Sequence, residues 1–280
     1  MTTKRIVGIA RGQGAAAVPV SYLRTVAPAG VGVVVDIAPS LPMQRVSRGA
    51  ALGSPWSGPD FCLLEGIDQD VAAQVERLLT NRMRLRRGDV LYRVGGRFSA
   101  LYAIRTGTCK TVMLAKNGLE QVAGLYITGE IIGLDGIDTD IHECQATALE
   151  DTEVCPLPFH EIERLAQRNA RLQHNLLRML MHRYARARRL MLVLGTMSGD
   201  QRLAVFLLDL SQRYQARGYS ACEFILRMTR NEIGSYLGLN LETVSRLFSR
   251  FQRAGLLQVE GRTVKLLDRV ALKWIVEGGA

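Results

Sequence analysis

The chain has 280 residues, enough for one to three domains with their own cores, and 48% hydrophobic and 22% charged residues, as in ordinary soluble proteins. Its formal net charge of +10 indicates an anionic partner, either nucleic acid or an acidic membrane surface. No apolar run is long enough for a spanning helix and no signal peptide is expected, so we expect a cytoplasmic protein with no membrane contact. The five cysteines are widely spaced without a CxxC pair, so we expect neither a disulfide framework nor a zinc finger.

Residues 1–58 are rich in Gly, Ala, Pro and Val without a sustained period, and they predict a disordered or poorly ordered N-terminal extension. A domain over residues 59–168 follows. It opens with a short amphipathic helix at 68–79 and continues with short strand-like runs separated by glycines. These runs are 90–94, 101–104, 109–114, 120–126 and 152–157. Frequent turn signals between short strands predict a small all-β sandwich or barrel.

A 3.6-residue period begins near Phe159 and predicts a long helix over residues 169–196. Apolar residues recur along it at gaps of 3 and 4, at Leu177, Leu180, Tyr184, Ala187, Met191 and Leu194. The other faces carry arginines, which we expect to flank the stripe and extend to water. Such a narrow stripe is typical of a two-helix seam, so the helix is predicted to dimerise; a core helix packed on its own β domain is the alternative.

The strongest local signal lies in the last predicted domain, residues 197–280. Thr229 and Glu232 form a T-x-x-E capping box that opens one helix, Gly238 follows at a turn, and Asn240 is a good N-cap for the next helix. The second helix has an apolar face of Val244, Leu247, Phe248 and Phe251. Two β-prone runs, 256–259 and 263–267, then surround Glu260-Gly261-Arg262 as a hairpin. This pattern predicts a winged helix-turn-helix.

The polar face of the second helix suits contact with double-stranded DNA. Arg246 can donate two parallel hydrogen bonds to guanine, and Glu242 can accept one from cytosine. Ser245 is short enough to let the backbone approach the DNA and can itself touch a thymine. The remaining candidates are expected to contact phosphates, which set register and salt dependence. They are Thr229, Arg230, Thr243, Arg250, Arg253 and Arg262.

From about Phe61 to Glu277 the chain resembles the CRP/FNR superfamily of transcription regulators, and the FNR branch in particular. The resemblance rests on ALYAIRTGTCK (100–110), RLAVFLLDLSQRYQARGYS (202–220) and RMTRNEIGSYLGLNLETVSRLFSRFQRAGLL (227–257). It implies an α+β protein with an N-terminal β-roll sensor domain (cupin-like, of the cyclic nucleotide-binding type), a long dimerisation helix and a C-terminal winged helix-turn-helix. The E-x-x-S-R of Glu242, Ser245 and Arg246 implies an inverted repeat with TTGAT half-sites.

Two features of that family are missing. Its cyclic-nucleotide binders have an Arg-Ser pair downstream of a GE-x-x-G stretch. Here GEIIG (129–133) is present, but the positions that correspond to the pair hold His142 and Glu143, so no cyclic nucleotide is expected. Its oxygen sensors hold a [4Fe–4S] cluster on four cysteines, of which only Cys62 and Cys155 have counterparts, so no cluster is expected. A thiol–disulfide switch between Cys62 and Cys155 is an open alternative to two unreactive thiols, and the sequence gives haem no particular support.

We therefore expect a non-enzymatic transcription regulator that acts as a homodimer without a cofactor. The sequence leaves activator and repressor open, and the resemblance implies that an activator of this family contacts RNA polymerase. The turn at 116–118 is a weak candidate for the polymerase contact. The alternative is a sensor of the same fold, redox-responsive through Cys62 and Cys155 or haem-binding, with weakened DNA recognition. Histidine spacing and the absence of a nucleophile–base pattern give an enzyme no support.

Overall fold

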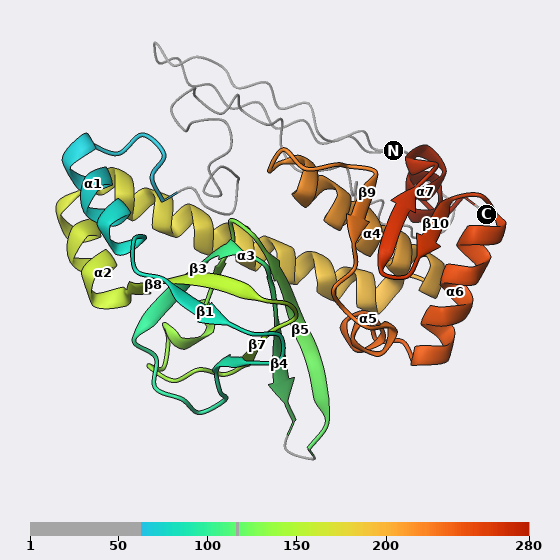
Figure 1. The fold of residues 1–280 in the computed structure, drawn as a ribbon, viewed down its shortest axis with the longest axis horizontal. Helices are drawn as coiled ribbons and strands as arrows, with labels where there is room; N and C mark the ends of the chain where they lie inside the picture. The colour runs from blue at the N-terminus through green and yellow to red at the C-terminus, as the bar shows by residue number, and fades with distance from the viewer. Residues whose placement is uncertain (1–62, 116–117, 280) are drawn as a thin grey trace, which may run out of the picture. The chain divides into compact units, whose positions relative to one another are not determined.

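The computed structural model describes residues 63–115 and 118–279 (Figure 1). The predicted N-terminal extension at 1–58 lies outside the described residues, as do Cys62, Lys116 and Asn117. In the ranges that are described, no helix combines the length and the apolarity needed to cross a lipid bilayer.

Two antiparallel sheets form the predicted β-roll. One has the strand order β1-β8-β3-β6 and the other the order β2-β7-β4-β5. The strands are β1 (Met83–Leu85), β2 (Val90–Tyr92), β3 (Ala100–Thr106), β4 (Thr108–Leu114), β5 (Glu120–Ile127), β6 (Ile131–Ile132), β7 (Gln145–Ala148) and β8 (Thr152–Pro158). Inward-facing residues such as Ile104, Cys109 and Val154 are fully buried in a core that both sheets share. A short 3-10 helix, η1 (Leu134–Gly136), follows β6.

The runs predicted as strands all form strands, with ends shifted by up to two residues. Three further strands, β1, β6 and β7, were not predicted. Each has two to four residues and is held by pairing with strands far away in sequence, as in the register of Met83 with Val154. A segment this short shows no period that the sequence alone reveals.

Three helices pack on the β-roll, and the third continues beyond it: α1 (Gln69–Leu78), α2 (Phe159–Arg168) and α3 (Ala170–Thr196). Asn169 caps α3 by accepting a hydrogen bond from the Leu172 N–H at 2.8 Å, and its amide donates to the Asp68 carboxylate at 2.8 Å. The first turns of α3 pack on the β-roll through Leu172 and Met179, both buried with α1 and α2 in one core. The predicted long helix is confirmed, starting one residue later than expected.

The expectation that the arginines of α3 extend to water is wrong for two of them. Arg183 and Arg186 have side chains only 16% and 19% exposed. The Arg183 guanidinium lies over the Tyr126 ring at 4.7 Å and donates to the Ile131 carbonyl at 3.0 Å. Acceptors and an aromatic face inside the protein therefore replace water for these two side chains.

The C-terminal part contains α4 (Gly199–Gln215), β9 (Glu223–Ile225), α5 (Arg230–Leu237), α6 (Leu241–Arg253), β10 (Leu257–Glu260), β11 (Thr263–Leu266) and α7 (Arg269–Val276). The hairpin of β10 and β11 confirms the predicted wing, and β9 joins it as a third strand in the order β10-β11-β9. Arg202 of α4 donates to the carbonyls of Leu194 and Leu237, at 2.8 and 3.0 Å. It thereby satisfies carbonyls that the ends of α3 and α5 leave without helical partners.

Candidate nucleic-acid interface

Helix α5 begins where the capping box predicts. The Thr229 hydroxyl accepts from the Glu232 N–H at 3.2 Å, and the Glu232 carboxylate accepts from the Thr229 N–H at 2.7 Å. Burial acts to raise the pKa of Glu232, but hydrogen bonds from Lys110 and Thr229 outweigh it and lower that pKa. Glu232 is therefore held ionised at the first turn of α5, where the helix dipole also favours a negative charge.

The turn between α5 and α6 depends on two glycines. Gly238 ends α5 in the left-handed region with φ of 62°, where a side chain would be strained. A Cβ on Gly234 would lie 2.5 Å from the Leu239 carbonyl oxygen, so only glycine allows the turn to pass this close to α5. Asn240 then caps α6, accepting from the Thr243 N–H at 2.7 Å. This geometry confirms the helix-turn-helix.

Helix α6 has one buried and one exposed face. Its buried residues are the predicted four, Val244, Leu247, Phe248 and Phe251. Glu242, Ser245 and Arg246 are exposed. The described residues provide no ion-pair partner for Arg246, and Ser245 donates locally to the Leu241 carbonyl at 2.9 Å. The three side chains predicted to contact bases are thus on the same solvent face as the arginines that follow them.

The side chains predicted to contact phosphates at the starts of α5 and α6 are partly buried or already hydrogen-bonded within the protein. Thr229 is exposed but engaged in its cap, and Thr243 is half-buried. The Arg230 guanidinium lies 3.2 Å from the centre of the Phe248 ring, and burial lowers its pKa to about 10. Arg230 therefore remains a cation at neutral pH, with one side already covered by an aromatic ring.

The other three phosphate candidates are exposed. Arg250 forms an ion pair with Asp200 at the start of α4, Arg253 donates to the Ser249 carbonyl at 3.4 Å, and Arg262 lies at the turn of the wing. Asp200 was not singled out from the sequence. Its carboxylate is the ion-pair partner of Arg250, and only the fold brings these two residues, 50 positions apart, together.

The predicted dimer seam is largely uncovered in the single chain. Leu177, Tyr184 and Met191 are 53%, 58% and 71% exposed, Ala187 is exposed as well, and Leu180 and Leu194 are half-buried. Met181, which was not in the predicted seam, is 60% exposed beside them. A stripe of exposed apolar side chains on a helix of this length is unusual for a surface that faces only water.

The β-roll contains the residues considered for sensing. Burial raises the pKa of the fully buried Cys155 thiol, and Cys62, its predicted redox partner, lies outside the described residues. His142 is 2% exposed and stacks on Tyr92 with ring centres 3.7 Å apart. Within 63–115 and 118–279, no three His, Cys, Asp or Glu side chains gather as metal ligands.

Family models match two parts of the chain. A Crp-like helix-turn-helix domain matches residues 201–275, and a cyclic nucleotide-binding domain matches residues 82–169. The first match covers α4 to α7 apart from the ends, and the second covers most of the β-roll with α2.

Curated relatives and a solved structure agree with these models. The chain is 43% identical over 215 residues to the transcriptional regulatory protein btr of Bordetella pertussis, covering 77% of this chain and 89% of that protein. It is 40% identical over 212 residues to the transcriptional activator protein Anr of Pseudomonas protegens, covering 76% and 87%. The structure of FixK2 from Bradyrhizobium japonicum matches with a TM-score of 0.64 at 29% identity, covering 69% of this chain and 95% of that one.

Proposed function

Because this chain belongs to the CRP/FNR family of transcription regulators, we propose that it binds double-stranded DNA as a homodimer at an inverted repeat with TTGAT half-sites. The regulator is not an enzyme, and its DNA-binding domain is the helix-turn-helix. The observation that carries the proposal is the solvent face of α6, where Glu242, Ser245 and Arg246 are exposed together.

Each residue of this face has a separate task. Arg246 donates two hydrogen bonds to a guanine in the major groove, Glu242 accepts from a cytosine, and the small Ser245 admits a thymine methyl group. Arg253 and Arg262 contact phosphates on either side, while Arg250 exchanges Asp200 for a phosphate. The DNA backbone is also contacted from the first turns of α5 and α6, by Thr229, Arg230 and Thr243.

The homodimer is formed along α3. Two copies of the exposed stripe of Leu177, Tyr184, Ala187 and Met191, with Leu180 and Leu194 at its edges, bury one another as a coiled-coil seam. Between Glu163 and Asp200 the sequence has no acidic residue, so no carboxylate on one helix repels its copy. Dimerisation is therefore expected to be constitutive.

The β-roll residues do not fit a cyclic nucleotide. The Glu130 carboxylate of GEIIG is fully buried and accepts hydrogen bonds from Arg213 and Arg217. In place of the Arg-Ser pair, His142 is packed against Tyr92 and Glu143 adds an acidic group, which would repel a phosphate. We propose that the domain works without a cyclic nucleotide.

We also propose that the protein holds no [4Fe–4S] cluster, since its five cysteines supply counterparts for only two of the four ligands. The alternative of a redox switch at Cys62 and Cys155 finds no support in Cys155, because a buried thiol with a raised pKa is a poor nucleophile. Haem binding likewise has no observation in its favour.

The regulator is proposed to act in the cytoplasm, as its DNA target requires, and to activate transcription through RNA polymerase. A relative that is named as a transcriptional activator supports this direction. The predicted polymerase contact at 116–118 falls mostly on residues outside the described ranges.

The proposal is tested by fluorescence anisotropy with the purified protein, in air and without added effector. We expect a dimer in size exclusion and binding to an inverted TTGAT repeat at least about 1,000-fold tighter than to a scrambled duplex of equal length. Equal affinity for both duplexes would contradict sequence-specific recognition, and a monomer that binds one half-site would contradict the dimer.

A further inference from the structure

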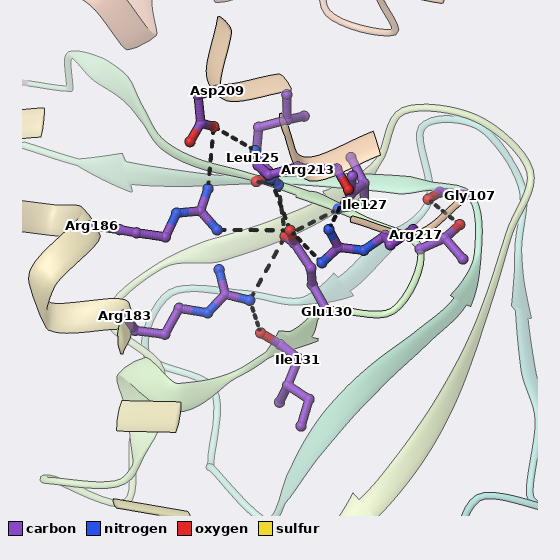
Figure 2. Close-up of polar contacts among 11 residues, drawn as sticks. Gly107, Leu125, Ile127, Glu130, Ile131, Arg183, Arg186, Asp209, Arg213 and Arg217 are labelled. Atoms are coloured by element: carbon purple, nitrogen blue, oxygen red, sulfur yellow. Dashed lines mark hydrogen bonds and ion pairs between the residues drawn. The ribbon is translucent and has the colours of Figure 1, made fainter. Parts of the chain in front are cut away.

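A buried carboxylate joins the β-roll to the DNA-binding part. Glu130 lies in the turn between β5 and β6 and is 0% exposed. Its Oε1 accepts from Arg213 Nε at 2.9 Å and from Arg217 Nη2 at 3.0 Å, and its Oε2 accepts from Arg213 Nη2 at 2.7 Å. Figure 2 shows the Glu130 carboxylate where these contacts converge. Arg213 thus forms a two-point contact, which fixes direction as well as distance.

The long helix reaches the same carboxylate from a third element. Arg183 Nη2 is 3.8 Å from Glu130 Oε2, and Arg186 Nη1 is 3.7 Å from Glu130 Oε1 (Figure 2). Asp209 of α4 lies 3.6 Å from Arg186 and 3.3 Å from Arg213. We call these six residues the Glu130 cluster: Glu130, Arg183, Arg186, Asp209, Arg213 and Arg217. The cluster connects the β5–β6 turn, α3 and α4.

The geometry of the Glu130 cluster is stringent because the charged groups at its centre are buried. The side chains of Arg213 and Arg217 are 8% and 3% exposed, and Arg213 Nη2 also donates to the Leu125 carbonyl at 2.7 Å. A charge withdrawn from water must keep its partners, since losing one leaves another charge uncompensated. A rotation of α4 against the β-roll would break several of these hydrogen bonds at once.

A second contact ties the helix-turn-helix to the same domain. Lys110 of β4 pairs with Glu232 of α5 at 2.5 Å, and the Ser235 hydroxyl of α5 accepts from the Val122 N–H of β5 at 2.9 Å. Val122 and Leu125 of β5 share one apolar core with Phe206 and Leu237 of the DNA-binding part. The orientation of α5, and with it α6, is therefore set against the β-roll.

From this arrangement we infer that Glu130 is a positioning residue that fixes the half-site spacing the dimer accepts. The inference rests on the proposed function. In a homodimer joined along α3, the distance and angle between the two α6 helices depend on how each DNA-binding part is held against α3 and the β-roll. The Glu130 cluster holds it at that junction, and half-site separation follows from this geometry. Glu130 itself touches no DNA.

The test uses full-length protein and a set of duplexes in which the two TTGAT half-sites are separated by the optimal spacer or by one or two base pairs more or fewer. The measured quantity is the ratio of affinities for the optimal and the altered spacers. A variant that is merely less stable loses active protein and binds every duplex less by the same factor, so the ratio is unchanged.

We expect Glu130→Gln to lower this ratio of affinities by roughly tenfold. Substitutions at residues that do not touch a ligand change the energetic coupling between distant sites by a factor of this order. The matched control is Glu161→Gln, which removes a carboxylate paired with Arg164 on the exposed face of α2 and should leave the ratio as in the wild type. Arg186→Gln, at the half-buried edge of the cluster, should lower the ratio in the same direction and decides the matter if Glu130→Gln does not fold.

Wild-type protein that prefers an inverted repeat, together with folded variants that keep its full ratio of affinities, would overturn the inference and leave the proposed function intact. Wild-type protein without preference for any inverted repeat would overturn the proposed function first.

Discussion

Arginines serve the exposed face of α6 and the interior of the Glu130 cluster in opposite ways. Arg246 on α6 is exposed, with no ion-pair partner in the described ranges. Arg213 and Arg217 are buried, and both donate to the carboxylate of Glu130. The same guanidinium group is exposed to solvent in one region and bound to a buried carboxylate in the other.

The difference shows that buried arginines stabilise the arrangement of the helices and strands, whereas exposed arginines are available to bind a ligand. A buried guanidinium needs a partner in fixed geometry, so it orients the elements that carry it. An exposed one has little effect on folding and is available to a phosphate or a base edge. The four arginines and two carboxylates of the Glu130 cluster leave a surplus of +2 at that site, so this part of the formal net charge of +10 is not carried by the exposed face of α6.

The largest effect on stability is expected at the centre of the cluster. Glu130→Gln leaves the buried guanidinium groups without their shared carboxylate and should lower the free energy of unfolding by about 3–5 kcal/mol. Urea denaturation followed by circular dichroism measures this loss. Arg246→Ala serves as the exposed comparison and should change the free energy of unfolding by less than about 0.5 kcal/mol. Equal losses in the two variants would remove the distinction between the regions.

The seam of α3 is exposed in one chain but should behave as an interior in the dimer. Met191→Lys would place two cations opposite each other in an apolar seam, and the dimer dissociation constant should rise at least about 100-fold, or about 2.7 kcal/mol. Analytical ultracentrifugation over a concentration series measures it. Met113→Lys, at a methionine 48% exposed on the β-roll, is the control, and it should leave the dissociation constant unchanged.

Substitutions of the exposed arginines on α6 should have different effects on the affinity for DNA and on the preference for its sequence. Arg246→Ala should weaken binding to the inverted repeat by about 1–3 kcal/mol and relax the preference at one base pair of each half-site. Arg253→Ala should weaken binding to all sequences alike. Anisotropy titrations with single-base variants of the repeat compare the two substitutions. A preference that Arg246→Ala leaves intact would contradict base contact by this residue.

Salt dependence should distinguish the exposed arginine of the wing, Arg262, from Arg250 of α6, which is paired with Asp200. Arg262→Ala should reduce the slope of log affinity against log salt by about 0.9 per subunit, because each phosphate contact releases counterions. Arg250→Ala should reduce the slope less, because Asp200 already pairs with Arg250 in the free protein. A larger reduction for Arg250→Ala would show that Asp200 does not compete.

The smallest effect is expected in the reactivity of the cysteines, where buried thiols can be compared with an exposed one. Burial raises the pKa of Cys109 to about 12, so this thiol stays protonated, and unreactive, as the pH rises from 7 to 9. Cys222 is exposed and should be alkylated within minutes in a Cys62→Ser background, whereas Cys155 should react only after unfolding. Mass spectrometry of iodoacetamide-treated protein identifies the modified residues, and rapid labelling of Cys155 in the native protein would revive the redox alternative.

Much of the C-terminal part could be predicted because its signals are local. The capping box of Thr229 and Glu232, the glycine at 238 and the Asn240 cap each act within a few residues, and the structure has all of them. The Glu130 cluster could not be predicted in this way. Glu130 and Arg213 are 83 positions apart, and arginines on a helical period resemble a solvated face until the fold supplies a buried carboxylate.

The central claim is that α6 recognises sequence through Arg246 in a symmetric dimer. The most direct measurement is a selection of bound sequences from a library of randomised duplexes, carried out in parallel with wild-type and Arg246→Ala protein. The wild type should enrich inverted TTGAT repeats at a single spacing, and Arg246→Ala should enrich repeats that have lost information at one position of each half-site. Identical sequence motifs from both proteins, or no repeat from the wild type, would contradict the claim.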